Sequence, residues 1–147
     1  MKAIIKTVAD EISTVLSKVE ESEAKALSAE LRKAKRIFVS GEGRSGLMGK
    51  AIAMRLMHGG FPVYVTGETI TPSIEANDLL LVISGSGSTG ALLQYAAKAK
   101  EVGAKLFAVT TNRESKLAQM SDGILVVPAA TKYRRPEEPV TIQPLGN

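Results

Sequence analysis

The stretch that most constrains the fold of this chain is residues 79–93, where an apolar run, a small-residue loop and a helical pattern follow one another. Residues 79–83 are apolar without alternation, which is typical of a strand buried on both faces of a parallel sheet. Residues 84–89 are all serine, glycine or threonine, and residues 91–99 form a strong helical pattern. The stretch therefore predicts a strand, a loop and a helix N-terminus in direct succession.

The loop at residues 84–89 has the composition of an anion-binding site. Free backbone N–H groups and the positive end of the helix dipole meet at a helix N-terminus, which suits a phosphate. Glycines allow close approach to a ligand, and hydroxyls donate to phosphate oxygens; the loop offers Gly85 and Gly87 with Ser84, Ser86, Ser88 and Thr89. No lysine follows a glycine, so this is not the nucleotide P-loop. The alternative is a plain turn of small residues.

The rest of the chain alternates strands and helices around this unit. Helices are expected at residues 2–20, 22–33, 46–58 and 115–120, and further strands at 36–40, 62–66, 105–110 and 123–127. This alternation indicates an α/β fold, a three-layer αβα sandwich around a five-stranded parallel sheet. We expect the flavodoxin-like strand order 2-1-3-4-5 and a single domain over residues 1–147.

A second glycine-rich segment follows the first expected strand. Gly41-x-Gly43-x-x-Gly46 matches the dinucleotide pattern G-x-G-x-x-G, but the acidic residue expected after the second strand, Glu68, is displaced past Gly67. In the order 2-1-3-4-5, the loops after strands 1 and 3 face each other where the order reverses. One phosphate with a short polyol fits between them, which disfavours a nicotinamide cofactor.

Composition excludes several other classes of site. The chain has no cysteine and one histidine, which excludes thiolate catalysis, disulfides and a Cys- or His-rich metal site. No apolar run reaches the ~18 residues of a membrane span, and Asp10 and Glu11 leave the N-terminus without a signal-peptide pattern. The basic residues behind the net charge of +4 are scattered, which gives no support for nucleic-acid binding. We expect a cytoplasmic protein.

The two loops also carry a family resemblance. Ser84-x-Ser86-Gly87-x-Thr89 and Gly43-x-Ser45, each after a strand, resemble the SIS (sugar isomerase) domain family. Four segments resemble its 6-phospho-3-hexuloisomerase branch, namely residues 43–46, 53–58, 67–72 and 143–146. The resemblance implies conversion of D-arabino-hex-3-ulose 6-phosphate to D-fructose 6-phosphate through an enediol, in the ribulose monophosphate route of formaldehyde fixation. It also implies that the enzyme uses no cofactor and no metal.

The resemblance further implies a homotetramer in which subunits share active sites. Members of the family continue past residues 143–146 into a long apolar helix that carries a glutamate, whereas this sequence ends at Asn147. We therefore expect a SIS domain without that helix. The wide apolar stripe of residues 2–20 independently predicts oligomerisation through the N-terminal helices.

Roles for individual residues follow from the chemistry, which needs a base, proton-shuttling groups and a grip on the distal phosphate. Phosphate and substrate binding is assigned to both loops, to Gly43, Arg44, Ser45, Ser84, Gly85, Ser86, Gly87, Ser88 and Thr89. Arg44 is expected to contact the sugar. The alternatives are that it crosses a subunit interface or is an ordinary solvated surface arginine. Glu68 is a candidate base or sugar ligand, and its alternative is an ordinary solvated loop glutamate.

His58 is the second candidate catalytic residue. It ends the helix that Ser45 begins, so at ~1.5 Å per residue it lies ~20 Å from the crevice of its own subunit. It is therefore either a structural histidine favoured by the helix dipole or a residue that reaches a neighbour's site. Lys132, Arg134 and Arg135 follow the last strand and could close over a phosphate, or form an exposed basic loop.

Two other functions remain open from the residues alone. One is a non-catalytic phosphosugar-binding module, as in SIS-type transcription regulators, and the other is an isomerase of a different phosphosugar. Those regulators carry an added helix-turn-helix domain, for which the 147 residues leave no room.

Overall fold

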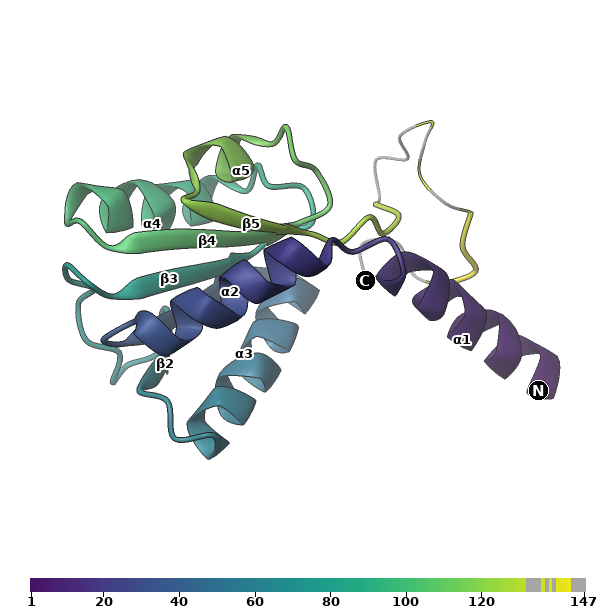
Figure 1. The fold of residues 1–147 in the computed structure, drawn as a ribbon, viewed down its shortest axis with the longest axis horizontal. Helices are drawn as coiled ribbons and strands as arrows, with labels where there is room; N and C mark the ends of the chain where they lie inside the picture. Colours follow the sequence, from purple (N-terminus) through teal and green to yellow (C-terminus); the bar gives the residue numbers. More distant parts are fainter. Residues whose placement is uncertain (132–135, 137, 139, 144–147) are drawn as a thin grey trace.

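The computed structural model describes residues 1–131, 136, 138 and 140–143 of the chain. Its centre is a sheet of five parallel strands in the order β2-β1-β3-β4-β5, as Figure 1 shows. The strands are β1 (Ile37–Gly41), β2 (Val63–Val65), β3 (Leu79–Ile83), β4 (Lys105–Thr110) and β5 (Gly123–Val126). The helices are α1 (Lys2–Leu16), α2 (Glu21–Lys33), α3 (Gly43–His58), α4 (Gly90–Glu101) and α5 (Lys116–Met120). The predicted α/β sandwich and strand order are confirmed.

The unbroken apolar run of β3 is explained by burial on both faces of the sheet. Leu80 packs with residues of α4 and α5 on one face, whereas Leu79 and Leu81 pack with Ala53 of α3 on the other. The α3 face also holds partly buried leucines of α2. Two helical layers thus enclose the sheet, and the strand has no polar side because neither of its faces meets water.

The first turn of α3 differs from the sequence-based expectation. The segment expected as a loop up to residue 46 is helical from Gly43, which has a φ of +55°. A Cβ on Gly46 would lie 2.6 Å from the carbonyl oxygen of Gly41, so only glycine lets the helix start this close to the end of β1. The glycine pattern therefore allows a close strand-to-helix junction and not a longer loop.

Helix α1 stands apart from the sandwich. It is shorter than expected, ending at Leu16, and projects beyond the edge at which the strands end (Figure 1). None of its residues, all of which are described, is buried. Within the described part of the chain, no helix combines the length and the apolar character that crossing a membrane requires.

One carboxylate joins α1 to the segment that follows β5. Glu11 accepts hydrogen bonds from the Thr141 hydroxyl at 2.6 Å, the Ile142 amide at 3.0 Å and the Gln143 side-chain amide at 3.0 Å. The Thr141 hydroxyl, followed by the other two donors, holds the pKa of Glu11 below its ordinary value, because each donor favours the ionised carboxylate.

We expect this contact to be lost in acid. A group whose pKa is lowered by folding contributes its full stabilisation above its ordinary pKa, and the contribution disappears as pH falls through the lowered value. In an NMR titration, the Ile142 amide and the Gln143 side-chain amide should therefore shift together, with a midpoint below the ordinary glutamate pKa. Glu11→Gln should remove this transition. A transition unchanged in the variant would show that another group causes it.

Candidate phosphosugar site

The two loops singled out in the sequence lie side by side at the edge where the strands end. Gly41 at the end of β1 pairs with Ile83 at the end of β3, and the next residues of each strand lead into α3 and the 84–89 loop. The order in which the chain adds strands reverses between β1 and β3, which is where a ligand site is expected in this architecture. The predicted juxtaposition of the two loops is confirmed.

The 84–89 loop is held in place by its own carbonyls and serines. The Gly85 carbonyl accepts hydrogen bonds from the Thr111 hydroxyl at 2.8 Å and the Thr110 hydroxyl at 3.2 Å. Ser84 is 4% exposed, and its hydroxyl accepts from the amide of Gly87 at 3.1 Å. Ser84 therefore shapes the loop from inside by accepting this bond, while its hydroxyl hydrogen can still be donated to a ligand.

Gly87 is the tightest point of this loop. Its φ is +60°, and a Cβ placed there would lie 2.1 Å from the Ser115 Oγ. Its carbonyl accepts from the Leu117 amide at 3.0 Å, and Ser115 caps α5 by accepting from the Ala118 amide at 3.2 Å. The loop is thus packed against the start of α5 with no room for a side chain.

Within this packing, the carbonyls of Gly85 and Gly87 accept hydrogen bonds from the protein itself, whereas two amides of the loop find no acceptor among the described residues. The amides of Ser86 and Thr89 have no acceptor in the described part of the chain. Thr89 is the N-cap of α4, a helix of 12 residues, so the positive end of its dipole adds to these amides. Ser88 is exposed and Ser86 partly so, and the Ser86 hydroxyl accepts from the Ser88 amide at 3.3 Å. The surface suits a phosphate group.

A cavity of about 480 Å³ joins the start of α3 to this loop. Arg44 and Ser45 line it from α3, and Gly85, Thr110 and Thr111 from the ends of β3 and β4. The sequence interpretation included Ser45 and Gly85 but missed the two threonines and Ser115. The signal was available, because Thr110 and Thr111 stand at the end of a strand that was predicted to finish at this edge.

Glu68 lies on the other side of the first turn of α3. It follows Gly67, whose φ is +85°, and its Oε1 lies 2.7 Å from the Nζ of Lys50, a residue of α3 that sequence reasoning missed. With Ser40 and Thr66, this pair lines a separate cavity of about 230 Å³. The candidate base therefore lies at the edge where the strands end, as predicted, but it lines a different cavity from Ser45 and Gly85.

The remaining candidates fall away from this edge or outside the described residues. His58 is exposed and is the last of the 16 residues of α3, at the end of the helix as the sequence predicted. Lys132, Arg134 and Arg135 lie outside the described residues. Among the residues that are described, no cluster of His, Cys, Asp or Glu could hold a metal ion.

Comparison with protein families settles the fold family of this site. The SIS domain model matches residues 30–140, which include the sheet, both loops and α3 to α5. The chain belongs to the SIS domain family. This assignment agrees with the resemblance carried by the two loops and replaces the dinucleotide-binding alternative raised by the G-x-G-x-x-G pattern.

Individual relatives of this SIS chain are isomerases by name. The 3-hexulose-6-phosphate isomerase of Mycobacterium gastri is 46% identical over 85% of this chain and 63% of its own length. That of Bacillus subtilis is 38% identical over 94% of this chain and 75% of its own. The crystal structure of a Methanococcus jannaschii protein, whose function was inferred from that structure to be 3-hexulose-6-phosphate isomerase, superposes on this chain with a TM-score of 0.77. The two chains are 36% identical in sequence, and the superposition covers 88% of this chain and 75% of the Methanococcus jannaschii chain.

The chain is short beside several of these relatives. It spans 63% of the Mycobacterium gastri enzyme, and 62% and 54% of archaeal relatives from Archaeoglobus fulgidus and Aeropyrum pernix. The sandwich and both loops lie within residues 30–140, the part of the chain that the SIS model matches.

Proposed function

We propose that the chain is a 6-phospho-3-hexuloisomerase, an enzyme that interconverts two ketose phosphates. The observation that carries the proposal is the packed 84–89 loop, whose amides meet the N-terminus of α4 beside the first turn of α3. Similarity to three proteins with this named or inferred function, at 36–46% identity, supports the choice of substrate.

The proposed reaction moves a carbonyl from C3 to C2 of the sugar. A base removes the proton at C2 to give a 2,3-enediol, a proton passes between the two oxygens, and a proton returns to C3. The loop amides and the hydroxyls of Ser86, Ser88 and Thr89 hold the phosphate, while Ser45 and Arg44 contact the sugar from α3. Fixing the phosphate holds the reacting carbons in one place, which lowers the entropic part of the barrier.

Glu68 is the proposed base, with Lys50 setting its orientation. The ion pair of 2.7 Å joins the loop after β2 to α3, so the carboxylate is held at the mouth of the cavity next to the phosphate loop. His58 is proposed to act in a neighbouring subunit of a homotetramer with shared active sites. The protein is proposed to work in the cytoplasm as a single SIS domain, with no cofactor, metal or nucleic acid.

The test is an isomerase assay. The chain should convert D-arabino-hex-3-ulose 6-phosphate to fructose 6-phosphate in a coupled assay without added metal or cofactor.

Ser84→Ala with Ser86→Ala should lower affinity for fructose 6-phosphate about 100-fold, because two hydrogen bonds at ~1.5 kcal/mol each shape or contact the phosphate site. Calorimetric titration measures this affinity, and an unchanged value would reduce the loop to a simple turn.

A non-catalytic phosphosugar-binding module is the second candidate. It is favoured by one observation, that the candidate base lines a different cavity from Ser45 and Gly85. Binding of fructose 6-phosphate without turnover of either ketose would support this second function over the first.

A further inference from the structure

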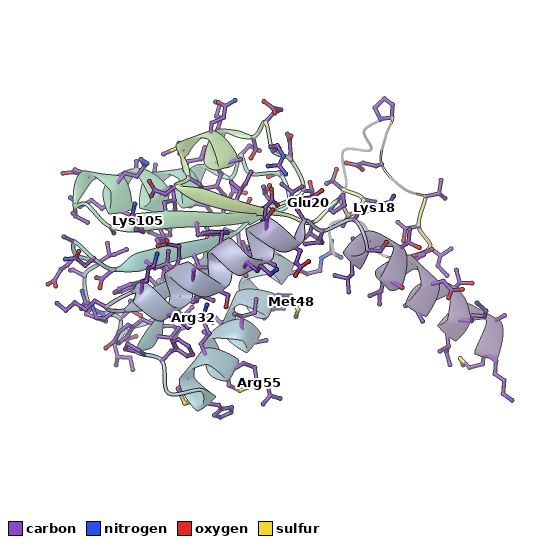
Figure 2. The ribbon with its side chains drawn as sticks, in the orientation of Figure 1. Lys18, Glu20, Arg32, Met48, Arg55 and Lys105 are labelled. Carbon is purple, nitrogen blue, oxygen red and sulfur yellow. The ribbon has the colours of Figure 1, made fainter. Side chains whose placement is uncertain are left out.

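One carboxylate joins α2 to the edge of the sheet where the strands end. Helix α2 begins beside the end of β5, where Figure 2 labels Glu20, the residue before the helix. The Glu23 side chain is 13% exposed, and its carboxylate accepts from the Val126 amide at 2.8 Å through Oε2 and from the Arg113 guanidinium through Oε1. Glu23 therefore bridges β5 and residues 110–115, the 110–115 turn, which runs from the end of β4 to the N-cap of α5.

The bond to Val126 fixes where this carboxylate lies. Strand β5 ends the strand order of the sheet, and the outward amides of an edge strand lie open to other acceptors. Val126 pairs in register with Thr110 of β4, and its amide donates outward to Glu23. Because this donor belongs to the backbone of the sheet, Glu23 presents its second oxygen to Arg113 from a fixed position.

The 110–115 turn is tied together across Arg113. The Asn112 amide donates to the Thr110 hydroxyl at 3.3 Å, towards the start of the turn. The Asn112 carbonyl accepts from the Ser115 amide at 3.1 Å, at the end of the turn. These bonds join the start of the turn to its end, so a shift at Arg113 displaces both.

Both ends of the 110–115 turn contact the 84–89 loop. At the start of the turn, the hydroxyls of Thr110 and Thr111 and the Thr111 amide all donate to the Gly85 carbonyl. At its end, Ser115 leaves no room for a Cβ on Gly87. The loop amides proposed to bind phosphate lie between and after these two contacts, so their direction depends on the position of the turn.

We propose that Glu23 and Arg113 are positioning residues of the phosphate site. Their ion pair holds the 110–115 turn against the end of β5, and the turn holds the 84–89 loop in the shape that binds phosphate. The inference rests on the proposed phosphate binding by that loop, but it does not depend on the isomerase reaction. Arg113 is 52% exposed, and a surface ion pair adds little to stability, so the main effect expected is on binding and not on the free energy of unfolding.

Calorimetric titration with inorganic phosphate and with fructose 6-phosphate tests the proposal. Glu23→Gln and Arg113→Gln should each lower affinity about tenfold, because either change removes the charge-assisted bond and frees the turn. The double variant should also lose about tenfold, since two residues that act through one contact are not additive. Arg113→Lys, which keeps the charge at a contact made through one nitrogen, should bind within about threefold of the parent chain.

Two ion pairs elsewhere in the chain provide controls. Lys25→Gln removes the exposed pair between Lys25 and Glu21, also on α2, and should change neither affinity nor stability. Arg36→Lys weakens the bond to buried Asp78 at the opposite edge of the sheet, and should lower the melting temperature without changing affinity. An affinity loss in Arg36→Lys equal to that in Arg113→Gln would show that general destabilisation explains the effect, and would overturn the proposal.

Amide chemical shifts of the free chain measure the same coupling without a ligand. Arg113→Gln should shift the amides of Gly85, Ser86 and Gly87, and Glu23→Gln should shift the same amides in the same direction. Unshifted loop amides, or a double variant that loses about 100-fold in affinity, would overturn the proposal. A parent chain that binds phosphate but does not interconvert the two ketose phosphates would contradict the isomerase and leave the positioning role standing. A parent chain that binds neither ligand would overturn both.

Discussion

Gly87→Ala is expected to lower affinity for fructose 6-phosphate at least 100-fold and to abolish measurable turnover. An alanine Cβ would lie 2.1 Å from Ser115 Oγ and 2.4 Å from Ser115 Cβ, distances that no rotation of the serine can relieve together. The φ of +60° adds roughly 1 kcal/mol for any residue with a side chain. The 84–89 loop must therefore move away from the start of α5.

The consequence for binding follows from the contacts made at Gly87. Its amide donates to Ser84 and its carbonyl accepts from the Leu117 amide at 3.0 Å. Moving the loop breaks both bonds and redirects the amides of Ser86 and Thr89, on which the proposed phosphate site depends. Calorimetric titration with fructose 6-phosphate and a coupled turnover assay measure the two losses.

Gly103→Ala provides the matched control. Gly103 also has a positive φ, +79°, but a Cβ there would meet only the Ala76 side chain at an ordinary 3.7 Å. The residue stands before β4, at the opposite edge of the sheet from the loop. Its substitution should lower thermal stability without changing affinity. Equal affinity losses in the two variants would show that general destabilisation, and not the shape of the loop, explains the effect.

The sequence predicted the central architecture because local pattern and burial agree there. The unbroken apolar run of β3 is typical of a strand covered on both faces, and the glycines and serines after it favour a tight turn. Right-handed crossovers leave few layouts, and the flavodoxin-like order expected among them places Gly41 beside Ile83.

The details of the site could not be predicted in the same way. Ser84 was predicted to contact phosphate directly, and that contact stays a prediction. The additional bond that its hydroxyl accepts from the Gly87 amide could not be predicted, because it depends on the exact path of the loop. Lys50 was missed because its partner, Glu68, is 18 positions away and reaches it only through the turn at Gly67. Thr110 and Thr111 act through the Gly85 carbonyl, which a pattern of side-chain types does not reveal.

The family resemblance predicted which phosphorylated substrate the protein acts on, which the residue pattern alone could not. A serine-rich loop at a helix N-terminus specifies a phosphate, but it does not distinguish a ketose phosphate from any other small phosphorylated metabolite. The choice of 3-hexulose 6-phosphate rests on segments such as residues 43–46 and 67–72, and the named relatives agree with it. The isomerase assay therefore tests the resemblance, whereas Gly87→Ala tests the loop.

The expected behaviour of His58 is complementation between subunits. His58 is exposed at the end of α3 opposite to the phosphate loop, so a role in catalysis requires a second copy of the chain. An imidazole can carry a proton between the two oxygens of the enediol.

His58→Ala and Gly87→Ala chains, each nearly inactive alone, should therefore regain activity when their subunits are mixed in equal amounts. A shared site takes its loop from one copy and its histidine from another. With random exchange, about one site in four combines an intact loop from a His58→Ala chain with an intact histidine from a Gly87→Ala chain. Activity should rise to about a quarter of that of the unmodified protein.

Exchange is verified first by native mass spectrometry with isotopically labelled chains. No recovery after verified exchange, or full activity of His58→Ala alone, would identify His58 as a structural residue that favours the helix C-terminus through its dipole.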